Sequence, residues 1–385
     1  MQISSALIVL VAMPAAAWPD DKPSAFTVGG LLFGDLYHIP SHHLAEGDGA
    51  TGAMVRRRYL TFNVRSGNGW FGRLRFEVNQ SDEFETCEFD ADVKDLYVGY
   101  KTQHHEFLLG LQPTRTFDVI GSVWDLRYLM RTPTDLQGEP SRDSGISAKG
   151  NFNDTWRYRV RLGSGLDYGD ETGDGDKAMA AVNWKVSDHW LLVFYLDYEE
   201  RPGPTDIATA QIFAAYQAEG IRAGAQYFYR DRGIETRGEL ASAFVVKDAG
   251  PRSSVIGRID RITEPSIKGD NISYIPFDPR SAATKLLTGF ELRVSDHFRI
   301  TPNTILISYD RNEDGIQPAT DFFLRVAAYI EFEQRSRPSP GAPSSHEGHR
   351  GISSLTPACT LTSERLLFPA ISTGRCNTFS KFLCR

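Results

Sequence analysis

The sequence has 385 residues, is 41% hydrophobic and 24% charged, and carries a formal net charge of -7 at pH 7. These values fit an ordinary globular protein and give no reason to expect nucleic acid as a partner. A disulfide framework is excluded as well, because Cys87 stands alone in the body of the chain while Cys359, Cys376 and Cys384 lie in its last stretch.

The first residues carry the pattern of a secretory signal peptide. An apolar run from Ala6 to Met13 is followed by Ala15-Ala16-Ala17, which fits the small-residue cleavage site of such a peptide. Residues 1–17 are therefore predicted to be a signal peptide. No later run of roughly eighteen apolar residues follows, so no transmembrane helix is expected and the exported chain is periplasmic, secreted or a β-barrel.

The body of the chain repeats stretches of roughly ten residues in which apolar and polar side chains alternate between Gly, Asp, Asn, Ser or Pro. Such alternation is typical of strands, and helical periodicity is absent. Residues 18–333 are therefore predicted to form an all-β barrel domain with about sixteen antiparallel strands. The predicted strands are 25–38, 54–65, 70–80, 93–102, 106–115, 143–152, 156–165, 177–186, 189–199, 206–218, 221–231, 239–248, 253–262, 284–294, 298–310 and 321–333.

Short and long links alternate between the predicted strands. The links at 66–69, 102–105, 153–155 and 187–189 are tight, whereas those at 39–53, 81–92, 112–142, 163–176 and 263–283 are long. A transmembrane barrel of a bacterial outer membrane sorts its links in this way, with short periplasmic turns and long external loops. A soluble, exported β-sandwich is the alternative, but it has no reason to sort its links.

The last predicted strand ends near Glu333. It alternates apolar residues from Phe322 to Phe332 with a more polar face that includes Arg325. Residues 334–385 lose this alternation and are rich in Pro and Ser, so they are predicted to be a disordered tail or an aberrant one produced by a frameshift. A basic arm that binds a partner is the other interpretation of this tail.

Arginines recur on the polar face of several predicted strands. An arginine near the bilayer midplane costs about 2–4 kcal/mol on the lipid face, so these side chains are predicted to point into the lumen. One hypothesis is that they bind anionic solutes, because rings of cations favour anions in a pore. The other is an unselective polar lumen, in which Glu77, Asp95, Asp260 and Glu291 balance the cations. The predicted pore-lining residues are Arg73, Arg75, Arg157, Arg159, Arg161, Arg222, Arg230, Arg258, Arg293, Arg325, Lys149 and Lys185.

Three consecutive arginines occur in the second predicted strand. Alternation places Arg57 toward the lumen and Arg56 and Arg58 outward, where they are expected to meet lipopolysaccharide phosphates. If the strand begins later, all three are solvated.

The long link 112–142 is predicted to fold into the lumen as a constriction loop. Its apolar residues need cover, which favours the inward fold over an external lid. The residues expected to narrow the pore are Arg115, Trp124, Arg127, Tyr128 and Arg131.

No catalytic, cofactor or metal site is predicted. His42-His43 and His104-His105 are neighbours whose side chains are expected to point to opposite faces, which argues against a shared metal. The acidic stretch 170–176 lacks the glutamate that completes an EF-hand. Because no known nucleophile, phosphate-binding or metalloprotease motif is present, an enzyme is not expected.

Short motifs spread along the chain resemble the phosphate-selective porin O and P family. They are Arg56-Arg57-Arg58-Tyr59-Leu60, Trp70 with Phe76, Lys94-Asp95-Leu96-Tyr97-Val98, Leu109-Gly110-Leu111-Gln112-Pro113, Ser141-Arg142-Asp143-Ser144-Gly145 and Gly257-Arg258-Ile259-Asp260. The resemblance implies a homotrimer of sixteen-stranded barrels, an inward third loop and passage of anions such as phosphate or polyphosphate.

These observations together predict an outer-membrane porin for passive diffusion of small hydrophilic solutes, with anions such as phosphate as the expected solutes. The expected partners are outer-membrane lipid and lipopolysaccharide, small anionic solutes and two further copies of the chain. The alternative is a barrel that transports nothing and acts through its external loops in binding or in a structural role.

Overall fold

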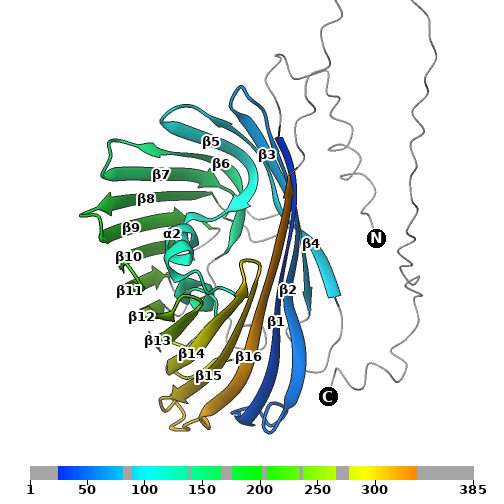
Figure 1. Cartoon of the computed structure of the whole chain (residues 1–385). Coiled ribbons are helices and arrows are strands. Elements are labelled where there is room, and N and C mark those ends of the chain that lie inside the picture. Colours follow the sequence, from blue (N-terminus) through cyan, green and yellow to red (C-terminus); the bar gives the residue numbers. More distant parts are fainter. Residues whose placement is uncertain are drawn as a thin grey trace, which may run out of the picture.

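The computed structural model describes residues 25–80, 89–137, 140–165, 176–201, 206–233, 237–265 and 277–335. In this part of the chain, sixteen strands form one closed barrel in which every strand is antiparallel to both neighbours (Figure 1). The predicted fold class is thus confirmed. The predicted signal peptide, the acidic stretch 170–175 and the tail from residue 336 onward lie outside the described residues.

The strands follow the predicted order, and most boundaries shift by only a few residues. The last strand continues two residues beyond the predicted end. The strands are β1 (Ala25–Ser41), β2 (Thr51–Arg65), β3 (Trp70–Gln80), β4 (Phe89–Lys101), β5 (His105–Pro113), β6 (Arg142–Asn151), β7 (Trp156–Gly163), β8 (Lys177–Lys185), β9 (Trp190–Glu199), β10 (Ile207–Ala218), β11 (Ile221–Asp231), β12 (Gly238–Gly250), β13 (Ser253–Ile262), β14 (Ala283–Ser295), β15 (Phe298–Tyr309) and β16 (Asp321–Arg335).

The strands present an apolar face outward and a mixed face inward. In β9, Phe194 and Leu196 are exposed on the outside, while Tyr195 and Asp197, which alternate with them, are buried. The other strands repeat this pattern, because successive side chains of a strand point to opposite sides of the wall. A closed barrel with an apolar exterior leaves no strand edge unpaired and suits a surrounding bilayer.

The tight links between strands lie at one end of the barrel and the longer links at the other end. We call the end with the tight links the short-turn end and the other the long-loop end. At the short-turn end Gly69 and Gly220 adopt positive φ angles of 98° and 68°, which tight turns require and glycine tolerates. Aromatic pairs mark the same end: Trp156 stacks on Trp184 with ring centroids 5.1 Å apart, and Trp190 lies 5.1 Å from Tyr216. Such aromatic residues are typical of a membrane interface.

In the described residues, two helices interrupt the strand order, both in the link between β5 and β6. They are α2 (Arg115–Trp124) and the 3₁₀ helix η2 (Pro133–Gln137). Among the described residues, no helix is long and apolar enough to cross a membrane.

This link lies inside the barrel (Figure 1). The Trp124 ring packs against Phe244 of β12 at 5.0 Å between centroids, and the Tyr128 hydroxyl donates a hydrogen bond to Glu291 of β14 at 2.8 Å. Apolar residues of the link and the wall form one buried cluster, which includes Ile120, Trp124, Leu126, Leu129, Leu136, Phe213, Leu240, Phe244, Leu287, Ile305 and Phe323. Part of the lumen is therefore packed like a protein interior.

Two β-bulges change which charged residues face the lumen. The pairing of β1 with β2 skips Arg56, and the pairing of β3 with β4 skips Lys94. A bulge inserts one residue and lets two successive side chains share a face. Arg56 therefore turns inward beside Arg57, and Lys94 beside Asp95. The prediction that Arg56 points outward was wrong for this reason, whereas Arg58 keeps the outward side of β2.

Candidate functional site in the lumen

Arginines of the wall hold the main chain of the inward link. Each donates a hydrogen bond to a backbone carbonyl between Trp124 and Gln137. Buried carbonyls need a donor, and a guanidinium offers five. These contacts fix the path of the link across the lumen. They are Arg222 to Trp124 at 3.4 Å, Arg56 to Tyr128, Arg325 to Leu129 at 2.8 Å, Arg258 to Arg131 at 2.7 Å and Arg232 to Gln137 at 3.3 Å.

Four of the arginines predicted to line the pore face inward but are closed off from solvent. They are Arg161, Arg230, Arg258 and Arg325, each at most 3% exposed. Arg161 contacts the Asp143 carboxylate at 3.3 Å and the carbonyls of Gln112 and Pro113 at 3.3 and 3.2 Å. Their surroundings therefore give these side chains a structural role in addition to their charge.

Arg161 and Arg157 of the same strand provide a direct comparison of stability. Arg161→Ala is expected to destabilise the barrel by about 3–5 kcal/mol, because it removes the cation that contacts the buried Asp143 carboxylate. Arg157→Ala is the matched control, since Arg157 is exposed at the short-turn end and surface charges contribute little. Urea unfolding in detergent micelles measures both. Equal midpoints would contradict the structural role of Arg161.

A second group of predicted residues remains partly open to the lumen. Arg75 donates to Thr61 at 2.9 Å and lies 3.5 Å from Asp95, with its side chain 21% exposed. Arg73 donates to Asn63 at 2.7 Å. Arg159, Arg222 and Arg293 are likewise intermediate in exposure.

The remaining predicted cations lie near the short-turn end. Lys149 pairs with Glu106 at 2.5 Å, and the exposed Lys185 pairs with Asp188 at 2.7 Å. Together with Arg157 they form the rim of the barrel.

Lumenal carboxylates are shared between cations. Glu77 contacts Arg57 at 2.6 Å and Lys94 at 2.5 Å, and its side chain is fully buried. Asp95 is likewise contacted by Arg142 at 2.5 Å and by Arg75. The acids that the sequence reasoning offered as balancing charges do form ion pairs, but each of these two faces a pair of cations.

The same sharing recurs around the lumen. Asp260 contacts Arg258 at 2.9 Å and Lys285 at 2.7 Å. Asp35 lies between Arg56 and Arg325, the latter at 3.7 Å. On β8 and β9, Lys177 lies 3.5 Å from Asp197 and 3.4 Å from Glu199, and Glu199 also contacts Arg201 at 2.5 Å and Arg230 at 4.0 Å. In these clusters of described residues the cations outnumber the acids.

The link adds further charge to the wall of β2–β6. Arg127 contacts Asp135 at 3.1 Å and keeps 27% of its side chain exposed. Burial alone would raise the pKa of Asp135, but the cations Arg127 and Arg131 lower it below its ordinary value. Arg127 therefore faces an ionised partner and still reaches solvent. Arg115 begins α2, and its side chain lies outside the described residues.

An aromatic ring lies at the centre of this charged wall. The guanidinium of Arg75 lies 4.8 Å from the centroid of the Tyr59 ring, and that of Arg57 lies 5.4 Å from it. Cations over an aromatic face are held by its quadrupole without losing their charge. The wall therefore keeps its positive character.

Sequence reasoning missed several cations of the lumen, namely Arg56, Lys94, Arg142, Lys177, Lys285 and Arg299. Arg56 and Lys94 were missed because strict alternation assigns them to the lipid face. The sequence did carry a signal for these bulges, namely two adjacent charged residues inside a membrane strand. In a regular strand one of the two side chains would face lipid, so such a pair indicates a bulge.

The net negative charge of the chain resides largely elsewhere. Several acidic residues in the links are exposed. Examples are Asp188 and Asp296 in short turns and Glu313 and Asp314 in the link between β15 and β16. The acidity of the whole sequence therefore does not describe the lumen.

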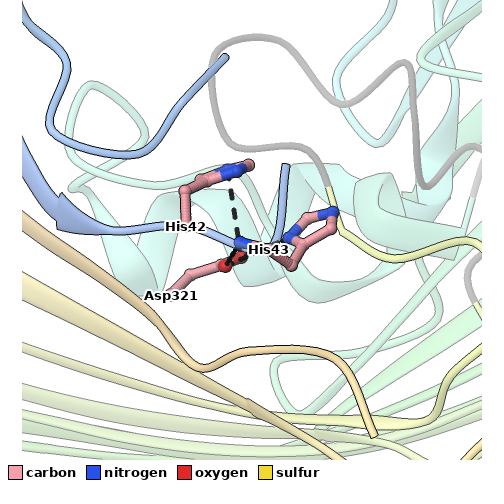
Figure 2. Close-up of side chains that lie close together, drawn as sticks. All are labelled: His42, His43 and Asp321. Atoms are coloured by element: carbon pink, nitrogen blue, oxygen red, sulfur yellow. Dashed lines mark hydrogen bonds and ion pairs between the residues drawn. The ribbon is translucent and has the colours of Figure 1, made fainter. Parts of the chain in front are cut away.

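Two adjacent histidines converge on one carboxylate at the long-loop end (Figure 2). His42 and His43 follow the last residue of β1, so strand alternation does not govern them, and their rings stack with centroids 4.5 Å apart. The expectation that they point to opposite faces was wrong. His104 and His105 in a short turn behave differently, with centroids 6.4 Å apart and rings at 71°.

Comparisons with known proteins identify the fold. No protein-family model matches the sequence, and no curated protein sequence is similar to it. Solved structures do match. The anion-selective porin from Comamonas acidovorans has a TM-score of 0.60 at 13% identity, covering 80% of this chain and 100% of that one.

Two further porin structures give the same result. OmpT of Vibrio cholerae has a TM-score of 0.57 at 11% identity and covers 81% of this chain and 99% of its own. OmpF of Salmonella typhi, solved in complex with daunomycin, has a TM-score of 0.58 at 9% identity and covers 80% and 97%. At such identities the likeness shows the fold alone: a sixteen-stranded barrel of the general porin type.

Proposed function

We propose that this chain is an outer-membrane porin through which small hydrophilic solutes diffuse passively, with a preference for anions. The supporting observation is the sharing of lumenal carboxylates, because clusters with more cations than acids keep a positive potential. Inside a barrel wall of low dielectric such a potential is screened less than on an open surface. It raises the local concentration of anions and lowers that of cations.

We assign the contact with permeating anions to the partly open cations around the inward link. Arg75 and Arg127 combine lumenal position with side chains that remain partly exposed. A planar guanidinium binds carboxylate and phosphate through paired N–H donors. Inorganic phosphate is therefore one of the proposed solutes, in line with the resemblance to phosphate-selective porins. The buried arginines do not contact the solute but add to the positive potential of the lumen.

The inward link is proposed to be the constriction of the pore. It fills part of the lumen with its apolar cluster and leaves Arg127 at its solvent-facing side. We further propose an N-terminal signal peptide, lipid and lipopolysaccharide around the wall, and a homotrimer. A solved form of OmpT from Vibrio cholerae is described as a trimer.

Planar-bilayer recording tests the proposal. The purified barrel is expected to give discrete conductance steps, and the reversal potential in a potassium chloride gradient is expected to lie on the anion side. Adding phosphate should reduce the chloride current if phosphate enters the same wall. A reversal potential at zero or on the cation side would refute the anion preference and leave the pore intact.

The rival function is a barrel that transports nothing. The observation that favours it is the packed apolar cluster, which closes part of the lumen. A folded, heat-modifiable barrel without any conductance steps would support this rival over the porin.

A further inference from the structure

The two histidines and the carboxylate described above lie on the seam of the barrel. β1 pairs with β16 to close the wall, but no short link joins these two strands, because they are the first and the last. His42 and His43 come directly after β1, and Asp321 is the first residue of β16 (Figure 2). The seam is thus bridged by side chains at its long-loop end.

The three side chains are compact and shielded. His42, His43 and Asp321 have side-chain exposures of 0%, 4% and 0%. Nδ1 of His43 lies 2.9 Å from Oδ2 of Asp321, and Nε2 of His42 lies 4.0 Å from the same oxygen. One ligand atom from each residue falls within 4.8 Å of the others. A tetrahedral zinc site places its ligands about 3.3 Å apart, so the separations on the His42 side must shorten by up to about 1.5 Å to close the set.

The carboxylate is held in a fixed orientation by neighbouring donors. The His43 backbone N–H donates to Oδ1 of Asp321 at 2.6 Å, and the Tyr309 hydroxyl donates to Oδ2 at 2.6 Å. The backbone N–H of His42 donates to Asp48 at 3.2 Å. Metal sites depend on such supporting hydrogen bonds, because they orient the ligands before the ion arrives.

The free-energy cost of binding an ion depends on which ring nitrogen of each histidine carries the hydrogen. In His43, Nδ1 faces Asp321, and Nε2 is buried without a hydrogen-bond partner among the described residues. When an ion takes Nδ1, the hydrogen passes to Nε2, and the Nδ1 contact with Asp321 is replaced by the ion that both residues bind. In His42, Nδ1 accepts the backbone N–H of Leu44 at 3.0 Å, so ligation through Nε2 gives up this one contact.

We propose that His42, His43 and Asp321 form a binding site for a divalent transition-metal ion of the zinc class, which fastens the barrel seam at its long-loop end. Two imidazoles and one carboxylate are a ligand set that zinc accepts, and water takes the fourth position. Calcium and magnesium prefer sites built from oxygen, so they are not the expected occupants.

Calorimetric titration of the full chain, folded in detergent and stripped by a chelator, tests the site with zinc chloride as the probe. The wild type is expected to bind one ion per barrel and to unfold at a higher temperature when zinc is present. The variant His42→Gln with His43→Gln is expected to lose both effects. The matched control is His104→Gln with His105→Gln, an adjacent pair at the other end that should keep the wild-type affinity.

Cobalt spectroscopy keeps the test decisive if the double variant fails to fold. Wild-type barrel loaded with cobalt chloride should show the intense visible bands of four-coordinate cobalt, whereas the weak spectrum of the hydrated ion would refute the site. Absence of zinc binding by the wild type, or equal loss in both variant pairs, would also refute it. These measurements use protein in detergent, so they are independent of conductance and of the proposed porin function.

Discussion

Replacing Arg75 and Arg127 by glutamine together is expected to lower the anion-to-cation permeability ratio about tenfold, which corresponds to about 1.4 kcal/mol. Both side chains are partly exposed and lie in the charged wall around Tyr59. Removing them leaves Asp135 without its contact to Arg127 and Asp95 with Arg142 as its remaining described ion-pair partner. The positive surplus of that wall then falls by two charges. Reversal potentials in a potassium chloride gradient provide the measurement.

The matched control for this prediction is the pair Arg157→Gln and Lys185→Gln. It removes the same charge from the exposed rim at the short-turn end, where salt screens it. Its permeability ratio is expected to stay near that of the wild type. A control that shifts the reversal potential as much as the lumenal pair would show that only total charge matters, and would exclude the proposed site.

Removing Arg258 and Arg325 together is expected to release the inward link and enlarge the pore. These residues hold the carbonyls of Arg131 and Leu129. Because Lys285 remains on Asp260 and Arg56 remains on Asp35, neither acid loses all its cations and the wall still closes. Alanine at both positions should raise single-channel conductance and current noise, and cost about 2–4 kcal/mol of stability through the freed carbonyls.

Arg73→Ala serves as the control for the released link. Its guanidinium donates to Asn63 on the wall and forms no described contact with the link. Its current noise should match that of the wild type, and its conductance should not rise as it does when the link is released. If the double alanine variant also matched the wild type in both, the arginines would not be what holds the link in place.

The barrel was predictable because bilayer physics leaves few solutions. Alternation along strands such as β9 and β16, and the sorting of links into tight and long ones, follow from the need to pair every backbone group in hydrocarbon. The lumen was less predictable. The bulges at Arg56 and Lys94 each insert one residue into a strand. A prediction that assumes strict alternation and ignores the bulge places the inserted side chain on the wrong face.

The apolar side chains that the wall contributes to the packed lumen were not predicted, although their sequence signal existed. In β10 and β12, apolar residues lie on both faces of the strand. In β10, for example, Ile212 is on the outside and Phe213 is on the inside. Strands with two apolar faces are those buried on both sides. The role of the arginines could not be predicted either, since binding a solute and holding a carbonyl require the same inward guanidinium.

The apolar cluster between the inward link and the wall changes how this barrel is expected to respond to temperature. Side chains on the lipid face exchange one apolar surrounding for another when a barrel unfolds within a membrane, so they gain little from water. Phe213, Phe244 and Trp124 are shielded from water instead of lipid. When unfolding exposes these side chains to water, the heat capacity rises. The contribution of the cluster to the free energy of unfolding therefore decreases on cooling, as it does in a water-soluble protein.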